Sequence, residues 1–205
     1  MTKAPITKTL DFLFDFASPN AYFAYKVLPP ILERTGADLK MTPVLLGGIF
    51  KATGNQPPMV QAANVPAKLK YGMLEIDRFV KKHHLTNYQF NPHFPVNTLA
   101  MMRASIVADA DGKLAPFLEA GFKAMWEDGL NMADADVMAG ALNAAGFDAA
   151  EMLTRTQDPD VKAKLMANTE DAVARGVFGI PTFFVGDEMY FGKDRLGEIE
   201  EALGA

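Results

Sequence analysis

Ser18 is the residue of this sequence best placed for chemistry, because it stands directly before Pro19 between two segments of different character. Residues 10–16 (LDFLFDF) are mostly apolar, and the residues after Pro19 have helical spacing. A helix start offers free backbone N–H groups and the positive end of the helix dipole, which together favour an anion. The chain has no cysteine, so a thiolate bound there must come from a small molecule, with the Ser18 hydroxyl donating a hydrogen bond to its sulfur. The alternative is that Ser18 is only a helix N-cap, the commoner role of such a serine.

Pro181 is the second candidate, because residues 178–182 (FGIPT) come directly before a segment with β-like composition. A cis peptide bond before Pro181 would turn the backbone N–H and C=O of Ile180 outward, where they could pair with an extended, peptide-like ligand. The alternative is an ordinary trans proline at a strand start, since only about 5–6% of X–Pro bonds in folded proteins are cis.

The elements that position Ser18 begin with residues 10–16, which predict a mostly buried strand. A helix is predicted from Pro19 to the residue before Gly36, and we expect the proline pair at 29–30 to kink or split it. Residues 38–42 alternate and predict a second strand. The long crossover between the strands implies that they are parallel.

The elements around Pro181 return to β structure after a long helical stretch. Residues 182–185 and 188–191 flank Gly186-Asp187, which predicts a β-hairpin. Asp194 is expected to cap a short helix that runs to Leu203. No β-like alternation of similar quality occurs between residues 47 and 176, where the predicted helices span residues 66–84, 97–110, 116–127, 134–145, 148–156 and 159–175.

This order of elements predicts an α/β protein with a thioredoxin-like fold (βαβ…ββα) and a large all-helical insertion. We assign residues 1–46 and 177–205 to the thioredoxin-like domain and residues 47–176 to the inserted helical domain. In such folds a cis proline faces the reactive position at the start of the first helix, so Ser18 and Pro181 are expected to face each other. Disulfide exchange by the chain itself is excluded, because it has no cysteine.

The composition excludes several other functions. The chain of 205 residues has 20 Lys and Arg against 25 Asp and Glu, a net charge of −5, and no basic cluster longer than Lys81-Lys82, so we expect no nucleic-acid partner. Residues 1–16 lack the layout of a signal peptide, and no window approaches the ~20 apolar residues of a membrane span. A cytoplasmic protein without membrane contact is therefore expected. His93 has no cysteine or acidic partner at ligand spacing, so we expect no metal site.

Several motifs resemble those of the 2-hydroxychromene-2-carboxylate isomerase family, which is related to the kappa-class glutathione transferases and has a DsbA-like thioredoxin fold. The similarity extends over about residues 10–203, with the motifs in family order, and this combination is more specific than any single motif. The matching segments are residues 14–19 (FDFASP) with Ala21-Tyr22, 46–55 (LGGIFKATGN), 94–98 (FPVNT), 179–182 (GIPT) and 191–195 (FGKDR).

The resemblance implies that glutathione is the cofactor and that Ser18 is the catalytic residue that holds its sulfur. Ile180 would pair with the cysteinyl unit of glutathione, and Asp194 would receive its γ-glutamyl end. The other implied glutathione contacts are Lys68, Pro181, Gly192, Lys193 and Arg195. Lys51 would pair with the substrate carboxylate and help to stabilise a developing enolate. The other implied substrate contacts are Asn55, Tyr71, Phe94 and Asn97.

The implied activity is the glutathione-dependent conversion of 2-hydroxychromene-2-carboxylate to trans-o-hydroxybenzylidenepyruvate, by reversible thiolate addition, in the degradation of aromatic compounds such as naphthalene. A kappa-like glutathione transferase is the alternative enzyme, and both would use the same thiolate. A non-catalytic, thioredoxin-like peptide-binding module is an alternative of another class. Lys51, Asn55 and residues 193–195 argue against it, because a peptide groove would not need them. The family further implies a homodimer.

Overall fold

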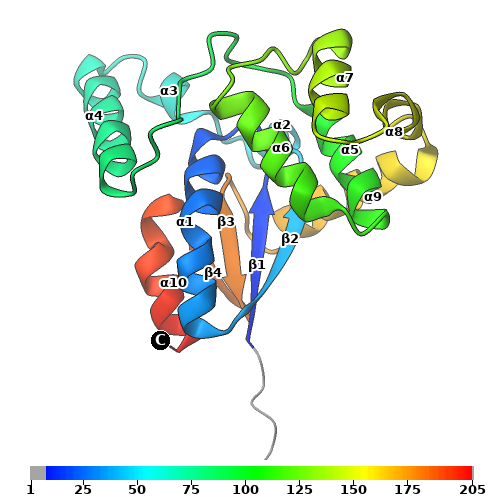
Figure 1. Ribbon diagram of the computed structural model, residues 1–205. Coiled ribbons are helices and arrows are strands. Elements are labelled where there is room, and N and C mark those ends of the chain that lie inside the picture. Colours follow the sequence, from blue (N-terminus) through cyan, green and yellow to red (C-terminus); the bar gives the residue numbers. More distant parts are fainter. Residues whose placement is uncertain (1–7, 205) are drawn as a thin grey trace, which may run out of the picture.

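A four-stranded mixed sheet lies at the centre of the computed structural model, which describes residues 8–204 (Figure 1). The strand order is β2-β1-β3-β4. β1 and β2 are parallel, whereas β3 is antiparallel to both β1 and β4, so the predicted parallel pair and the predicted hairpin are confirmed. The strands are β1 (Thr9–Phe14), β2 (Asp38–Pro43), β3 (Thr182–Val185) and β4 (Glu188–Phe191). The expectation about a signal peptide falls partly on residues 1–7, outside the described residues.

Helices α1 (Pro19–Thr35) and α10 (Leu196–Leu203) lie side by side on one face of the sheet (Figure 1). The proline pair at 29–30 was predicted to kink or split α1. The split is wrong, because one helix runs through both prolines. Each proline removes one helical hydrogen bond, from the carbonyl four residues earlier. Those carbonyls belong to Tyr25 and Lys26, which are only partly buried, while both prolines are exposed. Water can therefore satisfy the freed carbonyls at this surface.

The chain between β2 and β3 is helical, as predicted. Helices α4 to α9 agree with the predicted helices to within a few residues, whereas α2 and α3 were not predicted. α2 contains Gly47 and Gly48, which weaken a helical signal, and it has no side-chain N-cap. The helices are α2 (Leu46–Thr53), α3 (Pro58–Gln61), α4 (Pro66–Lys82), α5 (Leu99–Ala110), α6 (Leu114–Trp126), α7 (Ala135–Ala144), α8 (Ala149–Arg155) and α9 (Pro159–Ala174).

The sheet and the helical segment share one hydrophobic core, in which aromatic side chains dominate. The Phe16 ring packs edge-on against Phe117 and Phe122 of α6, with ring centroids 5.9 and 4.9 Å apart. The indole N–H of Trp126, at the end of α6, donates a hydrogen bond of 2.9 Å to the Phe16 carbonyl. This packing fixes the chain just before Ser18 against the helical segment. The fold is thioredoxin-like, as predicted, and the domain boundaries at residues 46–47 and 176–177 stay a prediction.

The contact between Phe16 and α6 depends on a missing side chain at Gly121. A Cβ atom added there would lie 2.5 Å from the Phe16 ring. We therefore expect Gly121→Ala to lower the free energy of unfolding by about 1–3 kcal/mol, because overpacking in a rigid core outweighs the gain of about 1 kcal/mol in helix propensity. Chemical unfolding followed by circular dichroism measures the change.

Gly140 in α7 provides the matched control, because a Cβ atom added there meets nothing within 4 Å. Gly140→Ala should raise the free energy of unfolding by about 0.5–1 kcal/mol. Equal effects of the two substitutions would contradict the proposed role of Gly121.

The helix start near Asp194 differs from the prediction. A 3₁₀ turn, η1 (Lys193–Arg195), precedes α10, and Asp194 lies inside that turn without capping a helix. Its carboxylate instead accepts a hydrogen bond of 2.7 Å from the Lys193 ammonium.

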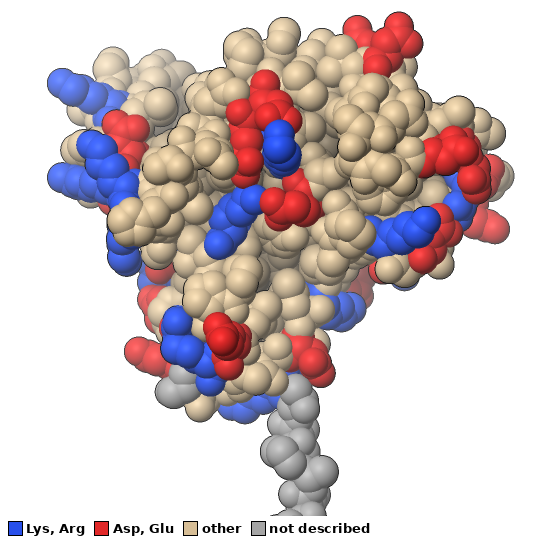
Figure 2. All heavy atoms as spheres, viewed as in Figure 1, with Lys and Arg blue, Asp and Glu red and all other residues tan. Residues whose placement is uncertain are grey.

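The surface charges are of mixed sign on the face that Figure 2 shows. Within residues 8–204, none of the helices combines the length and the apolar composition that crossing a membrane requires.

Candidate active site

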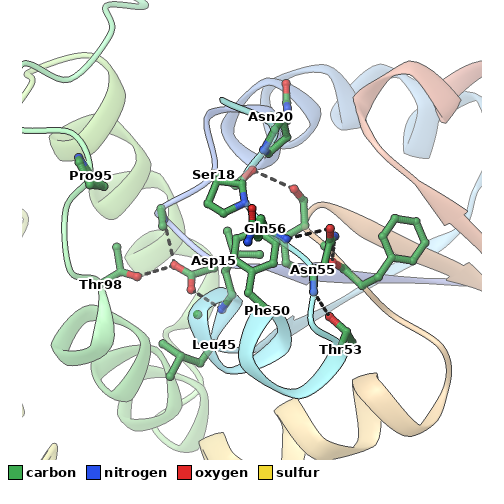
Figure 3. A pocket seen from close by; sticks show the side chains of 18 of the residues that line it. Asp15, Ser18, Asn20, Leu45, Phe50, Thr53, Asn55, Gln56, Pro95 and Thr98 are labelled. Atoms are coloured by element: carbon green, nitrogen blue, oxygen red, sulfur yellow. Dashed lines mark hydrogen bonds between the residues drawn. The ribbon is translucent and has the colours of Figure 1, made fainter. Parts of the chain in front are cut away.

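Ser18 lies at the junction between β1 and α1, where the residue types dictate a helix start. It has extended backbone angles, and its Oγ accepts a hydrogen bond of 3.2 Å from the Ala21 N–H, so it is the N-cap of α1. The same hydroxyl donates a hydrogen bond of 3.0 Å to the carbonyl of Ile180 (Figure 3). The N-cap therefore also reaches across to the second segment that was singled out in the sequence.

The Ile180–Pro181 peptide bond is cis. The Ile180 carbonyl faces Ser18, and the Ile180 N–H has no hydrogen-bond partner within residues 8–204. The Thr182 hydroxyl donates to the Gly179 carbonyl at 2.7 Å, and the Gly192 N–H donates to the Pro181 carbonyl at 2.9 Å. These bonds hold the cis turn in place, so that it presents one free donor beside the start of α1.

A cavity of about 1010 Å³ opens over Ser18 and Ile180. It brings together several of the residues that the resemblance implied, namely Ser18, Asn55, Phe94, Asn97 and Ile180. Much of the remaining lining is apolar, as in most small-molecule sites. Among the described residues, the lining includes no Lys or Arg. Its polar side chains outside the predicted set are Asp15, Asn20, Thr53, Gln56, Gln61 and Thr98.

Asn55 connects the end of α2 to the segment before the cis proline. Its Nδ2 donates to the Phe178 carbonyl at 2.7 Å, and its Oδ1 accepts from the Gln56 N–H at 2.9 Å and from the Gln61 Nε2 at 2.6 Å. Asn55 therefore connects the segments that line this side of the cavity by hydrogen bonds (Figure 3).

Other predicted residues lie elsewhere. Lys51 is exposed on the other face of α2, where it lines a second cavity. Lys68 and Tyr71 are exposed on α4 and do not line the cavity over Ser18. Lys193 is buried, with its ammonium 4.6 Å from the centre of the Phe79 ring.

The remaining predicted glutathione contacts lie around η1. The Lys193 ammonium pairs with Asp194, and Arg195 pairs with Glu198 at 2.5 Å. The Gly192 N–H donates to the Pro181 carbonyl at 2.9 Å. The residues of η1 therefore directly follow Gly192, which bonds to the cis turn, but they do not line the cavity over Ser18.

Asp15 is a site residue that was not selected from the sequence. It is 1% exposed and lines the cavity three residues before Ser18. Its Oδ1 accepts from the Ala17 N–H at 2.9 Å and from the Thr98 hydroxyl at 2.7 Å, and its Oδ2 accepts from the Leu46 N–H at 2.8 Å. One carboxylate thus connects the loop before α1, the start of α2 and the residue before α5.

Burial is the largest effect on Asp15, and it raises the pKa of this carboxyl although its hydrogen bonds act in the opposite direction. The signal available in the sequence was an aspartate inside an apolar run, residues 10–16. Such a residue is costly to bury without partners, so it indicates a specific polar network. Within residues 8–204, no group of three or more His, Cys, Asp or Glu is arranged to hold a metal ion.

The class of protein follows from the sheet order, the serine at the start of α1 and the cis proline opposite it. Residues 9–204 match the family model described as a DSBA-like thioredoxin domain. The chain is thus a thioredoxin-fold protein of the DsbA-like class, with a serine at the start of its first helix.

Within this class, the chain belongs to the 2-hydroxychromene-2-carboxylate isomerase family. It is 30% identical over 200 residues to 2-hydroxychromene-2-carboxylate isomerase of Sphingobium xenophagum, which covers 97% of this chain and 99% of that protein. It is 27% identical over 213 residues to glutathione S-transferase kappa 1 of Rattus norvegicus, with 98% and 92% covered. A solved structure of a 2-hydroxychromene-2-carboxylate isomerase superposes with a TM-score of 0.83 at 26% identity, covering 96% of this chain and 94% of that one.

Proposed function

We propose that this protein is a glutathione-dependent isomerase that converts 2-hydroxychromene-2-carboxylate to trans-o-hydroxybenzylidenepyruvate. The observation that carries the proposal is the pairing of the Ser18 hydroxyl with the Ile180 carbonyl beside the free Ile180 N–H, at one side of a cavity of about 1010 Å³. The identity of 30% to an isomerase over nearly the whole chain supports this reaction.

The residues around Ser18 fit a small peptide thiol. A cysteinyl unit carries a backbone N–H and C=O, which complement the Ile180 C=O and the unpartnered Ile180 N–H as in a short antiparallel pair. The cavity is as large as the pockets of roughly 300–1,000 Å³ that hold small molecules. The chain itself has no cysteine, so the sulfur has to be supplied by the ligand.

When bound, glutathione supplies the thiolate that adds reversibly to the conjugated double bond of the substrate. The Ser18 hydroxyl has a single proton, which it donates to the Ile180 carbonyl at 3.0 Å. With glutathione bound, Ser18 would turn this proton toward the sulfur, and the Ile180 carbonyl would be free to accept a peptide N–H. One hydrogen bond would thereby be exchanged for two, and the N-terminus of α1 would add its favourable field at the thiolate.

The described lining of the cavity over Ser18 includes no Lys or Arg, so it offers no cationic side chain to a substrate carboxylate. Phe50, Phe94 and Phe178 form apolar walls that suit an aromatic ring. The amide groups of Asn20 and Asn97 are the donors that would meet a substrate carboxylate or a developing enolate. Lys51, which lies on the other face of α2, would have to reach around that helix to take the role that the resemblance implies.

The test follows the ultraviolet spectrum of 2-hydroxychromene-2-carboxylate with purified protein, with and without glutathione, and counts free thiol during the reaction. Because the protein has no cysteine, every thiol counted belongs to glutathione. We expect rapid conversion that requires glutathione and leaves the thiol count unchanged.

Loss of free thiol in step with substrate would instead identify a transferase, the activity named for the rat relative. The remaining alternative is a non-catalytic peptide-binding module, which would show no affinity for glutathione. Calorimetry with glutathione alone distinguishes it from the enzymes. Either result would overturn the proposed isomerase.

A further inference from the structure

A second cavity, of about 1030 Å³, lies between α2, α5 and α9 on the side of α2 away from Ser18. Among the described residues that line them, the two cavities share only Leu45 and Leu99. Most of its wall is apolar: Leu45, Ala52, Leu99, Pro159, Ala163, Leu165, Met166, Val173 and Ala174.

The walls of this cavity are held together by close contacts at its base. The Leu45 N–H donates a hydrogen bond of 3.0 Å to the Thr169 hydroxyl of α9. A Cβ atom added to Gly48 would lie 3.1 Å from the Thr169 methyl group, so α2 approaches α9 closely because Gly48 has no side chain. The hollow is therefore a fixed feature of the packing between these helices.

The charges around the cavity are unbalanced. Among the described residues, Lys51, Arg103 and Lys162 line it together with a single acid, Glu170. No ion pair within 4.0 Å involves any of these four side chains in the described part of the chain. This excess of positive charge occurs in a chain whose net charge is −5.

Arg103 is the most informative of these residues. Its Nε is buried and has no hydrogen-bond partner. Each of the other arginines pairs with a carboxylate, namely Arg34, Arg78, Arg155, Arg175 and Arg195. A guanidinium presents its donors in a planar fork that matches a carboxylate or sulfonate, and a buried donor without a partner indicates a missing acceptor.

We infer that this cavity is a second binding site, for a small amphipathic anion with an aromatic or aliphatic body and one carboxylate or sulfonate group. Arg103 binds the anionic group, the positive charges of Lys51 and Lys162 attract it further, and the apolar wall covers the apolar body. The inference does not depend on the reaction proposed for Ser18. A second copy of the chain is the competing occupant, and the experiment distinguishes it.

The experiment measures binding of 1-naphthoate by calorimetry, with 1-naphthalenemethanol as the uncharged probe of the same ring. The cavity over Ser18 also suits an aromatic carboxylate, so Asn97→Trp is used to fill it. We expect a saturable naphthoate site that persists in Asn97→Trp and in saturating glutathione. The neutral alcohol should bind at least about tenfold more weakly, because it cannot accept a charge-assisted hydrogen bond.

Arg103→Met should weaken naphthoate binding at this site by about tenfold or more. Arg155→Met is the matched control, since it removes the same charge from a guanidinium that pairs with Asp111 instead, and it should bind like the wild type. Ala163→Trp, which fills the second cavity without altering a charge, should abolish this binding. It also keeps the inference testable if Arg103→Met fails to fold.

Absence of saturable binding, wild-type affinity in Arg103→Met, or loss of the site in Asn97→Trp would each overturn the inference. Sedimentation identifies the competing occupant. A wild-type oligomer that Ala163→Trp dissociates would show that a second copy covers this cavity, and that result would also overturn the inference.

Discussion

Ser18→Ala is expected to lower kcat for the glutathione-dependent isomerisation by roughly 10²–10³-fold, the usual effect of removing one donor aimed at a developing or bound anion. The physical reason is that the hydroxyl now bonded to the Ile180 carbonyl is the side-chain donor that we propose turns toward the bound sulfur. Without it, the pKa of the bound thiol should rise by about one to two units, because one hydrogen bond to a charged group contributes about 1.5–3 kcal/mol. Steady-state kinetics measure the rate, and the thiolate absorbance of the glutathione complex as a function of pH measures the pKa.

Two further variants separate this role from helix capping. Ser18→Ala also removes the N-cap of α1, which should lower the free energy of unfolding by about 0.5–2 kcal/mol. Asp148→Ala removes the cap of α8, where the carboxylate accepts from the Glu151 N–H at 2.9 Å, and should lose similar stability without losing rate. Ser18→Thr retains the hydroxyl and should keep most of the rate. Full activity in Ser18→Ala would mean that the serine is only a cap.

Asp15→Ala is expected to have the largest effect on stability, lowering the free energy of unfolding by about 3–5 kcal/mol. It leaves the partly buried N–H groups of Ala17 and Leu46 without their acceptor, and each such loss costs about 1–3 kcal/mol. Because these groups belong to the loop before α1 and to the start of α2, the rate should also fall by roughly 10²-fold in the protein that remains folded.

Urea unfolding and kinetics at low temperature measure these two effects of Asp15→Ala. Thr98→Val removes only one of the three hydrogen bonds and should lose about 1 kcal/mol. The double variant should lose less than the sum of the two single effects, since both act on one network. Full additivity would contradict the network that we describe.

The raised pKa of Asp15 predicts the sign of a pH effect on stability. Because burial holds this pKa above the ordinary value of 3.8, the folded protein binds the proton more tightly than the unfolded chain does. The contribution of Asp15 to stability is therefore largest at acid pH and decreases as the pH rises from about 4 through the folded pKa. Asp15→Asn cannot titrate, so the difference in unfolding free energy, wild type minus variant, should decrease over that range. Urea unfolding at a series of pH values tests it, and a difference that increases with pH would contradict the prediction.

Local signals in the sequence were sufficient for most of the fold. Ser18-Pro19 and Gly36 mark the two ends of α1, Gly186-Asp187 marks the hairpin, and period-two or helical spacing marks most other elements. These signals act through hydrogen bonds, turns and burial patterns that involve only a few neighbouring residues, so they can be recognised without knowing the rest of the chain. The proline pair in α1 shows their limit, because solvent around the exposed side of a helix can compensate for a local break.

Contacts between segments that are distant in the sequence could be identified only in the folded structure. Ser18 and Ile180 are 162 residues apart, and Asp15 bonds to Thr98, 83 residues away. The unpredicted helix α2 carries the wall that divides the two cavities, so its position decides that Asn55 lines one of them and Lys51 the other. Such arrangements depend on which faces of several helices pack together, and side-chain type and spacing along the chain do not specify this. For the same reason, the roles of the Asp15 carboxylate near Ser18 and of the unpaired Arg103 guanidinium could not be recognised without the packing of the helices.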